Sequence, residues 1–298
     1  MNNQLFKGLI LKSNHIDYPE NKSIKIYIKK FLDEGSYGLI FLIQNNHVIK
    51  LFKNSTQTNA ILNESNYLIP TKNENRELIF FLNYINKLLN NNKYITEIYA
   101  VGIIKDIIMF NSIKLSVNNY FIILPLYIPF YNIFTIYNIP LIDKHNGLSF
   151  TLKIMERLLE IAFFLETKYN LINVDSKLSN YMFICNDNNL NNLIMIDFSI
   201  IKKINLKKYN VTNKYYILPY GNNLLIQHFP SYSVCINALE LLFGYNKIRE
   251  LPDSDKINYY LSIIKKKNKN VYNIFLNGLI LKIKTEDLLI LLRNIIRI

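Results

Sequence analysis

Between residues 24 and 53, apolar and polar residues alternate with a period of two. The alternation starts with Ile24 and Ile26 and continues through two more apolar runs, separated by a short Asn-rich turn. A period of two predicts strands with one buried face. We therefore predict a strand meander over 24–53, and two further strands, at 98–104 and 120–124, would complete a five-stranded sheet.

Helical spacing replaces this pattern further along the chain. After a polar stretch over 54–73 that we interpret as a loop, residues 75–89 carry a single apolar stripe that predicts an amphipathic helix. Helices are also predicted, in chain order, at 149–168, 231–244, 259–265 and 285–297. Gly244 is a suitable helix stop. Apolar residues precede Asp175, and a short strand is predicted at 193–196 before Asp197, so the second part is mainly but not wholly helical.

Length and cysteine content restrict the class of protein. The 298 residues, half of them hydrophobic, suffice for a full core and two lobes, but are few for two independent domains with linkers. Cys185 and Cys235 imply no disulfide framework and indicate a reducing compartment. Residues 1–7 lack an apolar segment after a basic start, which argues against a secretory signal. We expect a cytoplasmic, intracellular protein.

One apolar stretch, over 120–142, is long enough to cross a bilayer. It is interrupted by prolines and asparagines at Pro125, Pro129, Asn132, Asn138 and Pro140. Interruptions of this kind disfavour a membrane helix. We predict no membrane span.

A pattern D-x-K-x-x-N carries the candidate chemistry. It comprises Asp175, Lys177 and Asn180, and an apolar run then leads to Asp197. Phosphoryl transfer from a nucleotide needs a carboxylate to orient the attacking hydroxyl, a cation beside the moving group, and oxygen ligands for magnesium. Asp175 would supply the carboxylate, Lys177 the cation, and Asn180 and Asp197 the metal ligands.

The upstream half of a nucleotide site occurs in the matching order. The segment Glu34-Gly-Ser-Tyr-Gly38 lies between two strand-like halves, and Lys50 follows on the next apolar strand. Glycines at a hairpin tip let the backbone approach phosphate oxygens closely, because no Cβ intervenes. A lysine on the next strand can point across the pleat toward the same phosphates.

These segments resemble four motifs of the protein kinase superfamily, in family order. They match its Gly-rich loop, its V-A-I-K strand, its catalytic loop and its D-F-G triplet. The resemblance implies an α+β, bilobal fold: an N-lobe over 1–124 with an antiparallel sheet and one helix, and a mainly helical C-lobe over 125–298. It also implies ATP and Mg²⁺ as cofactors. The density of Ile, Asn, Lys and Tyr is typical of an AT-rich genome and is similar to that of kinases from large AT-rich DNA viruses.

The resemblance also assigns nucleotide-binding roles. Gly35, Ser36, Tyr37 and Gly38 would cover the phosphates, and Lys50 would bind them. Glu77 is our choice for the helix glutamate that holds Lys50, with Glu74 and then Glu64 as the competitors. A hinge near Pro125 would place the backbone around Leu126 against adenine.

Several residues depart from the family pattern. Asp33 replaces the first glycine of the loop, Asn173 and Val174 replace the His and Arg before the catalytic aspartate, and Ser199 replaces the glycine of D-F-G. Pro230 stands where the family has an aspartate that braces the catalytic loop, and no A-P-E triplet follows. These departures keep open a pseudokinase, a scaffold that binds partners without catalysis.

The resemblance implies a serine/threonine protein kinase, because Lys177 is similar to the lysine of that class. A small-molecule phosphotransferase of the aminoglycoside type is the other enzyme alternative. The formal charge of +13 includes basic clusters at 202–214 and 265–269, which are most simply solvated faces. The first cluster, which follows the catalytic motifs in sequence, suggests an acidic protein substrate. Nucleic acid is a further possible partner, although no motif here reads bases. The oligomeric state is left open by the sequence.

Overall fold

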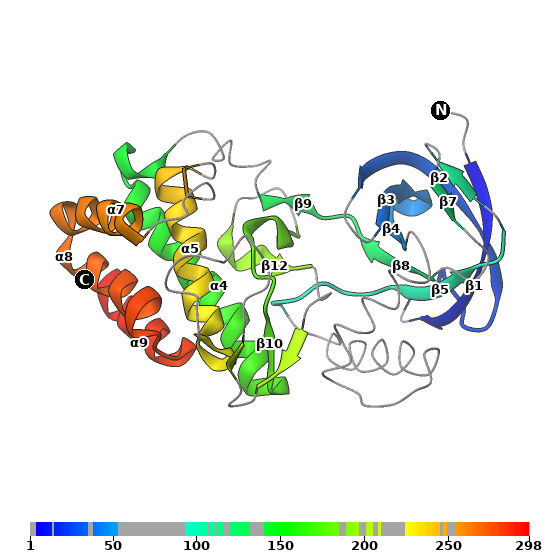
Figure 1. Ribbon diagram of the computed structural model, residues 1–298. Helices are drawn as coiled ribbons and strands as arrows, with labels where there is room; N and C mark the ends of the chain where they lie inside the picture. The colour runs from blue at the N-terminus through cyan, green and yellow to red at the C-terminus, as the bar shows by residue number, and fades with distance from the viewer. Residues whose placement is uncertain are drawn as a thin grey trace. The chain divides into compact units, whose positions relative to one another are not determined.

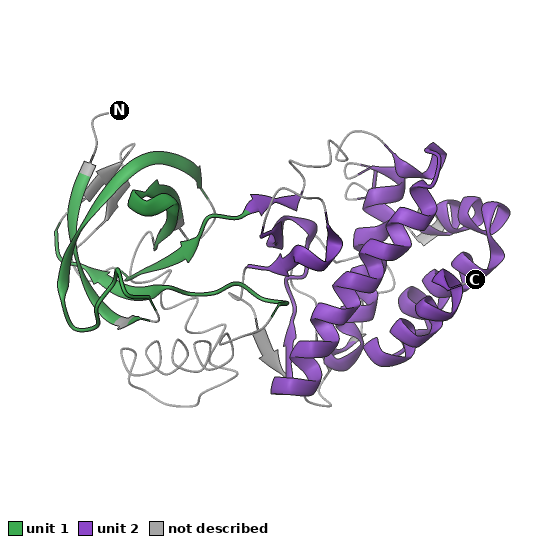
Figure 2. Cartoon of the chain, turned by 180° about the vertical axis from the view of Figure 1, so that it is seen from behind, with its two compact units in different colours: residues 1–127 green, residues 128–298 purple. Residues whose placement is uncertain are grey.

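The computed structural model describes residues 4–13, 15–34, 38–52, 93–106, 108–110, 113–115, 120–130, 140–184, 189–196, 201–204, 208–209, 224–244, 247–248 and 254–297. The chain separates into two compact units, residues 1–127 and residues 128–298 (Figure 2). Among the described residues, the first unit consists mainly of strands and the second mainly of helices, as Figure 1 shows.

Unit 1 is built around a closed antiparallel barrel with the strand order β1-β2-β3-β4-β8-β5 (Figure 1). Its strands are β1 (Gln4–Ser13), β2 (Ser23–Glu34), β3 (Gly38–Ile43), β4 (His47–Phe52), β5 (Ala100–Ile104) and β8 (Tyr120–Pro125). The predicted strand meander and the two later strands are confirmed. A short hairpin of β6 (Ile108–Phe110) and β7 (Ile113–Leu115) lies between β5 and β8 in sequence.

The strand β1 closes the barrel, because it pairs with both β2 and β5. The sheet therefore has six strands, whereas the sequence predicted five, and β1 is the strand that was not predicted. Phe6 and Ile10 of β1 point into the core, but Gly8 stands between them and weakens the apolar alternation in the sequence. A glycine inside a strand often marks a close approach of another group. Here that group is Phe121, since a Cβ at Gly8 would lie 2.8 Å from its ring.

Unit 2 is organised around α4 (Gly147–Tyr169) and α5 (Phe229–Phe243), which pack against each other. Every residue of α5 is buried, and Gly244, at φ 98°, ends the helix as predicted. The helices α7 (Ser254–Lys267) and α9 (Thr285–Ile296) confirm the two later helix predictions. The helix α8 (Lys269–Phe275) and the π-helix η7 (Leu276–Leu281) had not been predicted.

Short strands frame the candidate catalytic loop. β10 (Leu171–Asn173) pairs with β13 (Ile201–Lys203), and β11 (Tyr181–Phe183) pairs with both β12 (Leu193–Met195) and β9 (Ile128–Pro129). Another short pair is formed by β14 (Lys208–Tyr209) and β15 (Leu224–Leu225). β10 and β12 are buried, and so is β11 except for the partly buried Met182, so both ends of the loop between β10 and β11 start from fixed positions.

Three predictions concern segments that the structure describes only in part or not at all. The loop over 54–73 and the helix over 75–89 lie outside the described residues. In the apolar stretch over 120–142, the described residues include β8 and β9. Across the described part of the chain, no helix is both long enough and apolar enough to span a membrane.

Candidate active site

The predicted catalytic residues of unit 2 lie in the short loop that connects β10 to β11. The loop passes through a single 3₁₀ turn, η4 (Leu178–Asn180), before β11 begins. Val174 is buried, as are Asp175 and Asn180, which are only 5% and 4% exposed. Polar groups at this depth must be hydrogen-bonded within the protein, because leaving them unsatisfied is costly.

Asp175, Lys177 and Asn180 form one cluster, as the sequence predicted. Lys177 Nζ lies 2.9 Å from Asp175 Oδ2. Asn180 Nδ2 donates to the backbone oxygen of Asp175 at 2.6 Å and lies 3.1 Å from its Oδ2. The amide thus uses its nitrogen on the aspartate, and its oxygen is the atom suited to a hard cation.

Asn180 also connects the loop to the strand that precedes Asp197. The backbone N–H of Ile196 donates to the carbonyl oxygen of Asn180 at 2.9 Å, and Tyr181 pairs with Met195 in the β11–β12 ladder. The residue before Asp197 is therefore hydrogen-bonded to Asn180. Asp197 and Ser199 themselves lie outside the described residues.

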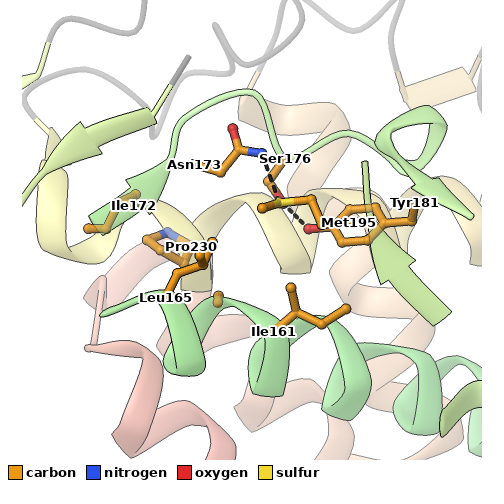
Figure 3. A pocket seen from close by; sticks show the side chains of 9 residues that line it. Ile161, Leu165, Ile172, Asn173, Ser176, Tyr181, Met195 and Pro230 are labelled. Carbon is orange, nitrogen blue, oxygen red and sulfur yellow. Dashed lines mark hydrogen bonds between the residues drawn. The ribbon is translucent and has the colours of Figure 1, made fainter. Parts of the chain in front are cut away.

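Asn173, at the last position of β10, caps the loop that follows this strand. Its Oδ1 accepts from the backbone N–H of Asp175 at 2.9 Å, and its Nδ2 lies 2.9 Å from the sulfur of Met195. Figure 3 shows Asn173 and Met195 joined in this way. The sequence had indicated Asn173 only as a departure. Its capping role follows from a general property of asparagine, whose side chain bonds readily to a backbone group two residues away.

Ser176, the residue after Asp175, is held through its side chain by β11. Its Oγ lies 2.6 Å from the hydroxyl oxygen of Tyr181 (Figure 3). The pKa of Tyr181 is raised to about 12, mainly by burial, while the hydrogen bond with Ser176 opposes the shift and the nearby Asp175 adds to it. Tyr181 is therefore neutral at physiological pH and keeps its O–H for this pair.

A small cavity lies directly beneath this loop. Its volume is about 10 Å³, and Figure 3 shows side chains from α4, α5 and the loop around it. The lining includes Ile161, Leu165, Asn173, Ser176 and Pro230. This volume is on the scale of one water molecule, so the cavity is too small for a nucleotide or another organic ligand.

α5 supports the loop from below, although Pro230 occupies its first turn in place of an aspartate. The supporting group is Asn237, whose Nδ2 donates to the carbonyl oxygen of Ser176 at 2.7 Å. Asn237 is fully buried. The sequence analysis missed this residue. The available signal was a lone amide within the apolar run of a predicted helix.

In unit 1, Lys50 lies on β4 and faces away from the barrel core. Its neighbours Ile49 and Leu51 are fully buried in that core, so the pleat directs Lys50 to the opposite face. Lys50 pairs in register with Ile40 of β3 and Ile122 of β8, and residues that face each other across strands share one face of a sheet. Lys50 therefore lies in an apolar row.

The structure describes only part of the predicted nucleotide loop. Gly38 begins β3 and pairs with Phe52 of β4. Asp33 is exposed, and its Oδ1 accepts from the N–H of Glu34 at 2.8 Å. Leu126 is 45% exposed and lies between β8 and β9. The remaining predicted residues, Gly35, Ser36, Tyr37 and Glu77, and the competitors Glu74 and Glu64, lie outside the described residues.

Within the described residues, no group of three or more His, Cys, Asp or Glu side chains could hold a metal ion. The predicted magnesium ligands are an amide and a carboxylate, Asn180 and Asp197, and Asp197 is not among the described residues. The oxygen of Asn180 is of the donor type that Mg²⁺ prefers. The donor chemistry of Asn180 therefore fits the ion.

Comparison with known proteins identifies the fold. No protein-family model and no curated protein matches the chain. Among solved structures, the ROP18 kinase domain in complex with AMP-PNP and sucrose has a TM-score of 0.64 at 10% identity, covering 99% of this chain and 86% of that one. A rhoptry kinase from Toxoplasma gondii has a TM-score of 0.56 at 10% identity, covering 99% and 84%.

The autoinhibited serine kinase domain of the giant muscle protein titin is also similar. Its TM-score is 0.59 at 12% identity, covering 91% of this chain and 81% of that one. All three similarities are similarities of fold. The chain therefore has the bilobal α+β fold of protein kinases, which confirms the predicted fold class.

Proposed function

We propose that this protein is an ATP-dependent serine/threonine protein kinase, which transfers the γ-phosphoryl group of ATP to protein hydroxyls. The observation that carries the proposal is that Lys177 and Asn180 lie 2.9 Å and 3.1 Å from the Oδ2 of Asp175, in a chain with the kinase fold. ROP18, which shares the fold, was solved with AMP-PNP, an analogue of ATP. This supports ATP as the nucleotide.

Asp175 would orient the hydroxyl of the substrate and accept its proton during transfer. Lys177, held 2.9 Å from Asp175, would place its ammonium group beside the transferring phosphoryl group. Asn180 and Asp197 would hold Mg²⁺, which neutralises charge on the phosphate oxygens when it is bound. Capping by Asn173 fixes the backbone from which Asp175 extends.

On the nucleotide side, Lys50 would bind phosphate oxygens, and Ile40 and Ile122 on the same face would exclude water around it. The predicted roles of Gly35, Ser36, Tyr37 and Gly38 as the phosphate-covering loop, of Glu77 as the partner of Lys50, and of Leu126 at the adenine are part of this proposal. The assignment of nucleotide binding to residues 1–124 and of catalysis to residues 125–298 is also part of it.

The chemistry of the cluster favours catalysis over a scaffold role. Every predicted phosphate- or metal-contacting residue is of a competent type, and the three described ones in unit 2 converge. Val174, in place of the family Arg, is buried and apolar, so it cannot pair with a phosphorylated activation segment. We therefore expect activity that does not depend on such phosphorylation.

A protein with acidic segments is the proposed substrate, because residues 202–214 are strongly basic. Reversing the charges with Lys207→Glu and Lys208→Glu should raise the KM for acidic peptides and leave the KM for neutral peptides unchanged. Equal changes for both peptides would argue against this choice of substrate. A cytoplasmic location and a viral source remain predictions from cysteine content and composition.

The direct test is transfer of radiolabelled phosphate from ATP, with Mg²⁺ and a panel of acidic and basic proteins. We expect label on serine or threonine with the wild-type chain, none with Asp197→Ala, and wild-type transfer with the control Asp287→Ala, which changes an exposed aspartate of α9. Bound nucleotide without transfer would indicate a pseudokinase. Label on an aminoglycoside but on no protein would indicate the small-molecule phosphotransferase.

A further inference from the structure

We infer that Asn237 is a positioning residue for the Asp175 loop, and that this chain braces its catalytic loop with a neutral amide from α5 instead of a charged group. The inference rests on the proposed function for its activity readout. The geometry behind it is the hydrogen bond from Asn237 Nδ2 to the carbonyl oxygen of Ser176, at 2.7 Å, between residues that are 61 positions apart in sequence.

This bond is made at the residue that follows Asp175, so it can influence the position of the Asp175 side chain. Ser176 follows Asp175 directly, and its Oγ lies 2.6 Å from the hydroxyl of Tyr181. Ser176 is thus fixed at its carbonyl by α5 and at its side chain by β11. With Asn173 bonded to the N–H of Asp175, the backbone is held on both sides of the aspartate. A hydrogen bond at each of these points restricts the direction in which Asp175 leaves the loop.

The environment of Asn237 indicates that its amide is retained for this bond. The side chain is fully buried in α5, where the surrounding residues are mostly apolar. Its Oδ1 has no hydrogen-bond partner among the described residues. A buried acceptor without a partner lowers stability. An apolar residue of similar size would avoid that cost, but it would also lose the donor to Ser176.

The cavity under the loop is lined by both polar and apolar side chains. The cavity beneath Ser176 has a volume of about 10 Å³ and is lined by Asn173, Tyr181 and Pro230 as well (Figure 3). Pro230 in the first turn of α5 offers no side-chain hydrogen bond to the loop. Asn237, seven residues further along the same helix, reaches the loop instead. In this chain the hydrogen bond from α5 to the loop therefore comes from a neutral amide in the middle of the helix.

The variant Asn237→Leu separates positioning from folding. It removes the donor and also removes the unsatisfied Oδ1, so we expect the thermal midpoint to stay close to that of the wild type. Loss of alignment at Asp175 should lower kcat about 10- to 100-fold with little change in the KM for ATP, because small displacements in an active site have effects of this size. Asn294→Leu, at an exposed asparagine of α9, is the matched control.

The variant Asn237→Asp tests the bond itself. An ionised carboxylate cannot donate to the Ser176 carbonyl, but a protonated one can. Burial raises the pKa of such a carboxyl. The kcat of Asn237→Asp, divided by that of the wild type, should therefore rise as the pH is lowered from about 8 to about 6. Asn294→Asp should show a constant ratio over the same range.

Hydrogen exchange gives a readout that does not require activity. Amides of residues 173–181 should exchange faster in Asn237→Leu than in the wild type or in Asn294→Leu. If the wild type transfers phosphate and Asn237→Leu keeps both its kcat and its exchange rates, the inference is wrong. If the wild type transfers nothing, the proposed function fails, and the exchange rates still decide whether Asn237 holds the loop.

Discussion

The barrel of unit 1 and the catalytic loop of unit 2 are held by different forces. The barrel is a continuous backbone ladder around an apolar core, with Phe121 against Gly8 and Gly102. The loop lacks a ladder of its own, and amide side chains such as Asn173 and Asn237 bond to its backbone. The free energy of unfolding of the barrel should therefore depend on how completely its core is packed. The geometry of the loop should depend on individual hydrogen bonds.

The strongest test of the packing side is Phe121→Ala. Phe121 is fully buried at the centre of the barrel. Its truncation should lower the free energy of unfolding by about 3–5 kcal/mol, the usual cost of removing a buried phenyl ring. Urea denaturation would measure this. Tyr27→Ala, at an aromatic residue of β2 that is 47% exposed, should cost far less, and equal losses for the two variants would contradict the packing account.

On the side of the loop, Asp175→Asn should separate activity from stability. We expect kcat for phosphoryl transfer to fall by about 10²–10⁴-fold, the range for loss of a general base. The free energy of unfolding should change by at most about 1 kcal/mol, because the partly exposed partner Lys177 can turn to solvent. Steady-state kinetics and urea denaturation on the same samples provide both values. A large loss of stability would show that the loop behaves like the core.

A double-mutant cycle refines the account of the barrel. A Cβ at Gly102 would lie 2.3 Å from Phe121 Cζ and 2.5 Å from the carbonyl oxygen of Leu9. We expect Gly102→Ala to cost about 1–3 kcal/mol through overpacking. Phe121→Leu should relieve part of that cost.

The control for this cycle is Gly244→Ala. Gly244 has a φ of 98° with no atom within 4 Å of its would-be Cβ, so its cost comes from the backbone alone. Its effect should be additive with that of Phe121→Leu. If Gly244→Ala and Phe121→Leu were coupled as strongly as Gly102→Ala and Phe121→Leu, a steric conflict between residue 102 and Phe121 would not explain the result.

The smallest expected effects are opposite pH dependences in the two units. Burial lowers the pKa of His47 from 6.5, and the neighbouring His15 lowers it further, while Asp17 raises it. The unfolded state then binds more protons, so this contribution to stability is complete above pH 6.5 and is lost as the pH falls. Burial raises the pKa of Glu166 from 4.5 to about 7, with Thr285 opposing and Glu286 adding to the shift.

The contribution of Glu166 has the opposite sign. It is complete below pH 4.5 and is lost as the pH rises toward about 7, because the folded state keeps the proton. In thermal midpoints measured across this range, His47→Gln should reduce the fall toward acid pH, and Glu166→Gln should reduce the fall between pH 4.5 and about 7. If Glu166→Gln made the second slope steeper, the assigned direction would be wrong.

The sequence predicted the elements whose side chains follow a period. The strands around Lys50 and the helices α4 and α5 have regular apolar spacing, and they formed where that spacing placed them. It also predicted the cluster of Asp175, Lys177 and Asn180, because its members are close in sequence. These features depend on residues that lie close together in the sequence.

The features that sequence analysis missed depend on contacts over long separations. β1 has a short pattern broken by Gly8, and its pairing with β5 joins residues nearly one hundred positions apart. The bond from Asn237 to Ser176 is a single side-chain contact across 61 positions, which no periodicity records. α8 and η7 escaped prediction because they follow α7 after a single non-helical residue, Asn268.

The closure of the barrel by β1 has a consequence for association. An open sheet exposes unpaired N–H and C=O groups along its outermost strands, and a foreign strand can add there. In this barrel every strand has a neighbour of the same chain on each side, although β1 covers β2 only as far as Ile28. A partner that binds by strand addition would first have to displace β1, so the barrel resists this form of aggregation.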